Sequence, residues 1–250
     1  MHSLRSFTAL KCAHNDEAIS VCLHKPNSKE YTSFYIMDYI LGQAKLNKLE
    51  NDADIYLKRF VTFYKGQNMI KDAYKKISWH YLIHGDTMKY EIYRGLSRKL
   101  GATNTDEDKN AETESESGYY PDMNLIKARL LFDGGYYDNA EAVMKNINVN
   151  DLKNNFRRIE YYYRYGRIMH EKNKIANAIE LYKNTIDISG NSTLYFAPNS
   201  CLQLGYIYEK LGYHDLAKMY YEKVMDYSNF EYRTSITQKA KTALTKLEKK

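Results

Sequence analysis

Small, alanine and aromatic positions recur along the chain with one spacing. A small residue is followed twelve positions later by an alanine, and four positions further on by an apolar or aromatic residue. The three clearest copies are Ala128, Ala140 and Met144; Gly166, Ala178 and Tyr182; and Gly205, Ala217 and Tyr221. A repeat of this kind predicts a stack of similar helix pairs instead of one globular core.

The last copy shows how one pair is built. Its apolar pattern predicts a first helix over 199–211, which Gly212 ends, and a second helix over 215–227. Gly205 and Ala217 are expected where these two helices approach most closely, because a larger side chain would hold the helices apart.

These residues resemble the tetratricopeptide repeat. That family has a Leu-Gly or Leu-Ala pair, a tyrosine three positions on, and an alanine twelve positions after the small residue. The match is carried by residues 124–147, 161–186 and 201–224. The resemblance implies an all-α, right-handed superhelical array of antiparallel helix pairs, which is a tetratricopeptide-like α-solenoid.

Weaker copies precede the clear ones. Ser6, Gly42 and Ser78 stand at small positions, but Ala53 lies one residue out of register and Tyr90 replaces the expected alanine. An irregular helical bundle with chance spacing is the alternative to an array here.

We expect a single helical-repeat domain over 1–250 with about five to six helix pairs. It contains weak repeats at 3–100, an acidic insert at 101–118, clear repeats at 121–230 and a C-terminal capping helix at 233–250.

The acidic insert changes the charge balance of the chain. It holds six acidic residues and one lysine, so its net charge is −5 and the other residues carry +11. A solvated loop or a short polar helix between two repeats is one interpretation. The other is an acidic segment that folds over a basic groove and competes with a ligand.

The C-terminal helix has one apolar face and many lysines. Ile236, Ala240, Leu244 and Leu247 line that face. We interpret the helix as a cap, because the last repeat of a stack has no neighbour to cover it. A tail that binds nucleic acid or a membrane surface is the alternative.

No pattern in the chain predicts catalysis or a cofactor. There is no GxSxG elbow, P-loop or GxGxxG, and the three cysteines form no CxxC pair. His80 and His84 could share one helix face, with Asp86 as a conceivable third metal ligand, but a zinc protease would need a glutamate directly after His80. We therefore expect no enzyme activity, no cofactor and no metal, with a metal-dependent enzyme as the alternative.

Residues 157–167 mix arginines with tyrosines, and the chain carries a net charge of +6. Such mixtures can stack bases and bind phosphates. Because these tyrosines go all around a helix, several of them must pack against neighbouring helices. Packing is therefore the main interpretation, and a peptide groove or a nucleic-acid surface are the alternatives.

In the tetratricopeptide family the first helices of the pairs line a concave groove that holds an extended peptide or a partner's helix. Register with that family gives Arg129, Phe132, Tyr163, Arg167, His170, Tyr206 and Lys210 as groove residues. Arg129 and Arg167 would anchor a carboxylate or backbone carbonyls. Tyr163 and Tyr206 would supply flat contact area. The set lacks the Lys/Arg/Asn cluster of chaperone-binding members, so chaperone binding is not expected.

The expected function is a non-catalytic module that binds a protein or peptide partner in its groove. The alternative is a nucleic-acid-binding helical repeat that uses 157–167. No apolar run reaches the roughly 18 residues of a membrane span, and no signal peptide is evident, which predicts a cytoplasmic protein. The chain starts almost within a helix, and a chain that lacks an upstream segment is the alternative interpretation.

Overall fold

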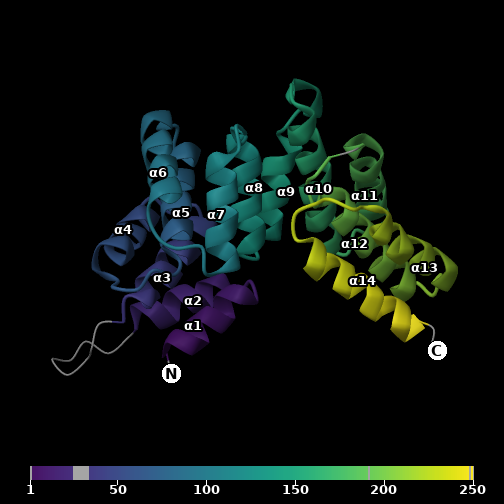
Figure 1. The fold of residues 1–250 in the computed structure, drawn as a ribbon, viewed down its shortest axis with the longest axis horizontal. Coiled ribbons are helices and arrows are strands. Elements are labelled where there is room, and N and C mark those ends of the chain that lie inside the picture. Colours follow the sequence, from purple (N-terminus) through teal and green to yellow (C-terminus); the bar gives the residue numbers. More distant parts are fainter. Residues whose placement is uncertain (1, 25–33, 191, 248, 250) are drawn as a thin grey trace. The chain divides into compact units, whose positions relative to one another are not determined.

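The computed structural model describes residues 2–24, 34–190, 192–247 and 249 (Figure 1). The described residues form helices and turns, with no strand among them. The chain divides into two compact units, Met1–Ala140 and Glu141–Lys250, here called unit 1 and unit 2.

The described residues of unit 1 form eight α-helices and the start of a ninth. They are α1 (His2–Lys11), α2 (Asn15–Leu23), α3 (Ile36–Asn47), α4 (Ala53–Phe63), α5 (Ile70–Ile83), α6 (Thr87–Lys99), α7 (Asp106–Glu116), α8 (Met123–Asp133) and α9 (Tyr137–Lys145).

Unit 2 takes in the end of α9 and five further α-helices. They are α10 (Asn155–Glu171), α11 (Ile175–Ser189), α12 (Phe196–Lys210), α13 (His214–Lys223) and α14 (Arg233–Leu247). Two short 3₁₀ helices, η1 (Val149–Asp151) and η2 (Val224–Asp226), lie between them.

Consecutive helices pack as pairs in both units. α1 packs on α2, α3 on α4 and α5 on α6, and in unit 2 α10 packs on α11 and α12 on α13. Turns of three to five residues join the members of each pair, so the two helices run antiparallel. The predicted all-α class of stacked helix pairs, as in a tetratricopeptide α-solenoid, is confirmed.

The predicted close approach within a pair is present at three glycines. A Cβ atom placed on Gly205 would lie 2.3 Å from the Tyr221 ring, and one on Gly166 would lie 2.9 Å from the Tyr182 ring. At Gly42 the nearest atom is Leu57 Cγ, at 2.6 Å. Each glycine therefore lets one large side chain of the second helix lie directly on the backbone of the first.

The small positions of the weaker copies are also buried. Ser6 and Ser78 lie in the interior, and Ala53 is fully buried although it is one residue out of register. Tyr90, which replaces the expected alanine on α6, is buried as well, with its ring 5.0 Å from that of Tyr120.

Most of the acidic insert is helical. The Thr105 side chain accepts a hydrogen bond from the Asp108 N–H and so caps the start of α7. Asp108 is fully buried, and its carboxylate accepts hydrogen bonds from the backbone N–H groups of Met69 and Asp72, at 2.6 and 3.1 Å. The α5 N-terminus has no side-chain cap of its own, so α7 supplies one from 36 or more residues away.

Polar contacts hold α7 against α5 and α6. Lys71 pairs with Glu112 at 3.0 Å, and the Trp79 indole N–H donates to Glu114 at 2.7 Å. Ala111 is the apolar residue that α7 buries. Most of the insert is thus a short polar helix, and its Glu112 meets one basic side chain of α5.

The C-terminal helix packs on α12 and α13. Ile236 and Ala240 are buried, as the apolar pattern predicts, and Ala243 is buried beside them. Leu244 and Leu247 lie at the edge of the contact and are half-buried.

One carboxylate in unit 2 forms ion pairs with three lysines. The Glu141 side chain is 6% exposed and lies 2.8 Å from Lys145, 2.5 Å from Lys172 and 2.8 Å from Lys174. Hydrogen bonds from the three ammonium groups lower the pKa of Glu141 to about 2. The glutamate therefore ties α9 to the turn between α10 and α11.

Replacing Gly205 tests the helix contact. Gly205→Ala should lower the free energy of unfolding by about 1–3 kcal/mol, because the new methyl group overpacks the Tyr221 ring. Gly95→Ala on α6 is the control, since no atom lies within 4 Å of its added Cβ. Urea unfolding followed by circular dichroism measures both variants, and equal stability of the two would contradict the assigned register.

The Glu141 cluster predicts an acid-sensitive contribution to stability. A carboxyl whose pKa is lowered by folding stabilises the protein above its unfolded pKa of about 4.5, and this stabilisation is lost as the pH falls through about 2. Glu141→Gln should therefore lower stability at pH 7 and flatten its dependence on pH between about 4.5 and 2. Thermal unfolding across this range measures the effect, with Glu180→Gln on α11 as the control.

Candidate functional site

The structure places the seven predicted groove residues on three helices. Arg129 and Phe132 lie on α8 in unit 1. The other five lie in unit 2, with Tyr163, Arg167 and His170 on α10 and Tyr206 and Lys210 on α12. Because α10 and α12 are in contact, unit 2 is where the structure brings most of the set together.

The two residues of unit 1 lie in aromatic contacts. The Arg129 guanidinium is 4.6 Å from the centre of the Trp79 ring, and Arg129 Nε is 3.9 Å from the Asp133 carboxylate. The Phe132 ring is 5.4 Å from that of Tyr137. Both side chains are half-buried.

Tyr163 joins α10 to α12. Its side chain is 3% exposed, and its ring lies 4.9 Å from the Phe196 ring. Its hydroxyl accepts a hydrogen bond from Asn199 Nδ2 at 2.6 Å and another from Arg167 Nη1 at 3.2 Å. The residue therefore positions its neighbours and offers little surface to a ligand.

His170 lies one turn of α10 beyond Arg167 and is half-buried. The Tyr182 hydroxyl is 3.5 Å from its Nδ1 atom. Burial lowers the pKa of His170 and so favours the uncharged form of its ring.

Tyr206 and Lys210 are the exposed members of the set. Tyr206 is 37% exposed, and its ring lies 5.7 Å from that of Tyr221. Partial burial raises the pKa of Tyr206, so its hydroxyl remains protonated and can donate a hydrogen bond at neutral pH.

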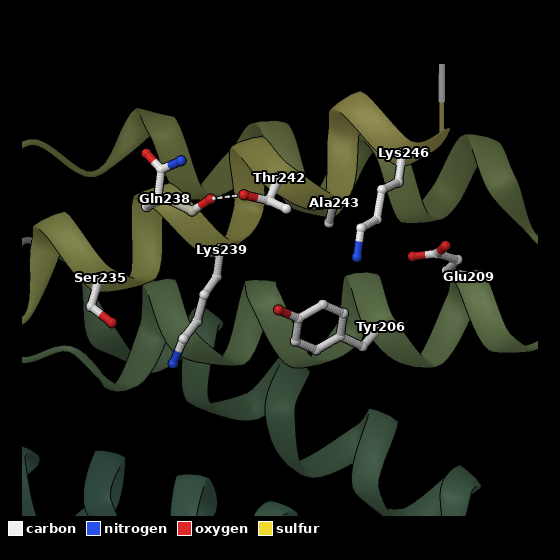
Figure 2. Close-up of a pocket in the computed structure, with 8 residues that line it drawn as sticks. All are labelled: Tyr206, Glu209, Ser235, Gln238, Lys239, Thr242, Ala243 and Lys246. Carbon is white, nitrogen blue, oxygen red and sulfur yellow. Dashed lines mark hydrogen bonds between the residues drawn. The ribbon is translucent and has the colours of Figure 1, made fainter. Parts of the chain in front are cut away.

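Tyr206 lines a cavity of about 440 Å³ between α12 and α14 (Figure 2). Glu209 contributes from α12 as well, and its carboxylate accepts a hydrogen bond from the Tyr221 hydroxyl at 2.9 Å. The lining residues from α14 are Ser235, Gln238, Lys239, Thr242, Ala243 and Lys246.

These α14 side chains are not assigned to a site from the sequence, which indicates only that the lysines lie on the polar face of a capping helix. A signal was present, because Ser235, Lys239, Thr242 and Lys246 recur every three or four residues and so form one polar stripe on a helix. Only the packing of α14 on α12 shows that this stripe borders Tyr206.

A family comparison agrees with the last helix pair. The tetratricopeptide-repeat family model matches residues 198–230, which span most of α12, all of α13 and the turn after it. This part of the chain is a tetratricopeptide repeat. The resemblance on which the sequence analysis relied is thereby confirmed, and the cavity lies on the first helix of this repeat.

Two solved structures are similar over nearly the whole chain. The apo form of RapI is 13% identical and covers 99% of this chain and 86% of its own, with a TM-score of 0.43. The TPR2AB domain of yeast Sti1, in its pHSP90 complex, is 16% identical and covers 99% of this chain and 97% of its own, with a TM-score of 0.40. No curated protein sequence matches the chain.

Of the two histidines considered as metal ligands, His84 has both ring nitrogens in other contacts. His84 Nε2 lies 2.8 Å from Asn51 Oδ1, and its Nδ1 lies 2.7 Å from the His80 carbonyl oxygen. Among the residues that the structure describes, no three His, Cys, Asp or Glu side chains are grouped to hold a metal ion. No helix within the described ranges is both long and apolar enough to cross a membrane.

Several side chains of 157–167 pack inside unit 2. Arg164 pairs with Glu160 at 2.5 Å, and both side chains are largely buried. Tyr161 and Tyr163 are buried too. The arginine and tyrosine mixture therefore serves helix packing at these positions, which is the main interpretation of the sequence.

Removing one hydroxyl tests the link between α10 and α12. Tyr163→Phe should lower the free energy of unfolding by about 1–2 kcal/mol, because Asn199 and Arg167 lose their shared acceptor. Tyr162→Phe is the matched control, and we expect a change within about 0.5 kcal/mol there. Urea unfolding compares them, and an unchanged Tyr163→Phe would contradict the role given to this hydroxyl.

Proposed function

We propose that the chain is a non-catalytic protein-interaction module that binds an extended peptide segment of a partner protein in unit 2. The cavity at Tyr206 carries this proposal. It lies on the first helix of the tetratricopeptide repeat, where an aromatic side chain and several polar side chains surround a space of about 440 Å³. A volume of this size accommodates a few side chains of a peptide.

Tyr206 is the central contact residue in this proposal. Its ring is held on one side by Tyr221, so the other side is presented in a fixed orientation. A rigid aromatic ring gives contact area at a low cost in conformational entropy. Its protonated hydroxyl can donate to a peptide carbonyl oxygen.

We infer that Arg167, His170 and Lys210 extend the contact surface along α10 and α12. Arg167 is oriented through the Tyr163 hydroxyl, which fixes part of its guanidinium before any partner arrives. Such preorganisation strengthens binding by reducing the side-chain entropy lost on association.

Arg129 and Phe132 are proposed as a second contact row in unit 1. The Trp79 ring holds the Arg129 guanidinium by a cation–π contact. The cytoplasmic location expected from the sequence stays a prediction.

Capture from native extract tests the function. The purified chain is used as bait with and without nuclease, and the bound proteins are identified by mass spectrometry. We expect a nuclease-resistant protein partner whose recovery falls at least fivefold with Tyr206→Ala. Tyr213→Ala is the matched control, because Tyr213 is 59% exposed and lies outside the cavity.

The same experiment distinguishes the alternatives. Recovery that disappears with nuclease would favour the nucleic-acid function. Recovery unchanged in the triple variant Arg129→Ala, Arg167→Ala, Tyr206→Ala would contradict the proposed surface.

A further inference from the structure

Two ammonium groups project into the Tyr206 cavity from α14. Figure 2 shows Lys239 and Lys246 extending from α14 toward α12, with the Tyr206 side chain between them. Within the part of the chain that the structure describes, neither amine has an ion-pair or hydrogen-bond partner, and nor does the Tyr206 hydroxyl. The cavity therefore offers two positive charges and one neutral donor to a ligand.

The charge of the cavity favours a negatively charged ligand. Glu209 is the acidic residue of the lining, so the two lysines leave the lining with a net charge of +1. The Glu209 carboxylate also accepts a hydrogen bond from the Tyr221 hydroxyl. A second carboxylate near the amines would gain charge-assisted hydrogen bonds, which are about twice as strong as neutral ones.

The spacing of the two lysines indicates what carries that charge. Lys239 and Lys246 are seven residues apart, so their backbone positions are separated by about 10.5 Å along α14. In an extended polyproline II peptide, side chains three residues apart lie on the same side and about 9.3 Å apart. Two acidic side chains at that spacing can each meet one ammonium group.

We propose that this cavity recognises an acidic peptide segment of the form Asp/Glu-x-x-Asp/Glu, through Lys239 and Lys246. Tyr206 contacts the residues between the two carboxylates. The inference rests on the proposed function and names its ligand class. It also gives α14 a role beyond capping, as one wall of the binding site.

Internal carboxylates are favoured over a C-terminal one. A single terminal carboxylate places its two oxygens close together, so it meets one amine well and leaves the other in solvent. Two amines at opposite ends of the cavity match two separate carboxylates.

Fluorescence anisotropy with short synthetic peptides tests the inference. The probe is an N-acetylated, C-amidated peptide with the core Glu-Pro-Pro-Glu, whose prolines favour the extended conformation. The controls are Gln-Pro-Pro-Gln, which lacks the charges, and Glu-Glu-Pro-Pro, which keeps the charges at the wrong spacing. We expect the probe to bind at least tenfold more tightly than either control, and more weakly as salt is raised.

Matched variants assign the effect to the cavity. Lys239→Gln with Lys246→Gln should weaken binding of the probe about tenfold. Lys241→Gln with Lys249→Gln removes the same charge from exposed positions outside the cavity and should leave the affinity within twofold. Circular dichroism confirms that both double variants remain helical.

The outcomes separate this inference from the proposed function. Any of three results would overturn the inference: equal affinity for the probe and its glutamine control, no measurable binding of the probe, or an unchanged affinity in Lys239→Gln/Lys246→Gln. So would tighter binding when the peptide carries a free C-terminal carboxylate, or displacement of the probe by single-stranded RNA. The proposed function would survive these results if a nuclease-resistant partner still depends on Tyr206.

Discussion

The contact between a glycine on one helix and an aromatic ring on the next sets the geometry of unit 2. The Tyr221 ring lies directly on Gly205 and the Tyr182 ring on Gly166, so the second helix of each pair packs closely against the backbone of the first. Successive residues of a helix point about 100° apart. Since Gly205 faces α13, its neighbour Tyr206 is turned toward the surface between α12 and α14, and the candidate site is therefore a consequence of the same packing that forms the repeat.

Unit 1 depends on buried charged side chains and the partners that pair with them. Its α5 buries Lys71, Asp72, Lys75 and Lys76, which are expensive to remove from water unless they are paired. Asp72 meets Lys75 at 2.9 Å and accepts the Tyr39 hydroxyl at 2.6 Å, and the neighbouring lysines hold the pKa of its carboxyl well below the usual range despite its burial. The acidic insert supplies two further partners to α5. Glu112 pairs with Lys71, and Asp108 accepts a hydrogen bond from the backbone N–H of Met69 at the start of the helix, so the acidic composition of the insert matches its contacts with α5.

Local spacing predicted the last helix pair well. The expected ranges 199–211 and 215–227 correspond to Phe196–Lys210 and to His214–Lys223 with the following 3₁₀ turn. α12 starts three residues earlier than expected, and Pro198 lies in its first turn, where a proline is tolerated. By contrast, the burial of Tyr163 depends on rings from the start of α12, more than 30 residues away, and no periodicity within α10 reveals that contact.

The cavity shows why alignment with the repeat pattern identifies only some of the residues of a candidate site. The family pattern predicted that Tyr206 faces the groove, because that depends on the helix alone. It could not supply Lys239 and Lys246, because their orientation depends on which face α14 buries. Ile236, Ala240 and Ala243 form that face, and burying them turns the polar stripe of Ser235, Lys239, Thr242 and Lys246 toward α12. A helix that covers the end of a stack needs a polar outer face. Where the polar stripe of α14 borders α12, its side chains therefore line the cavity in which we propose that a partner binds.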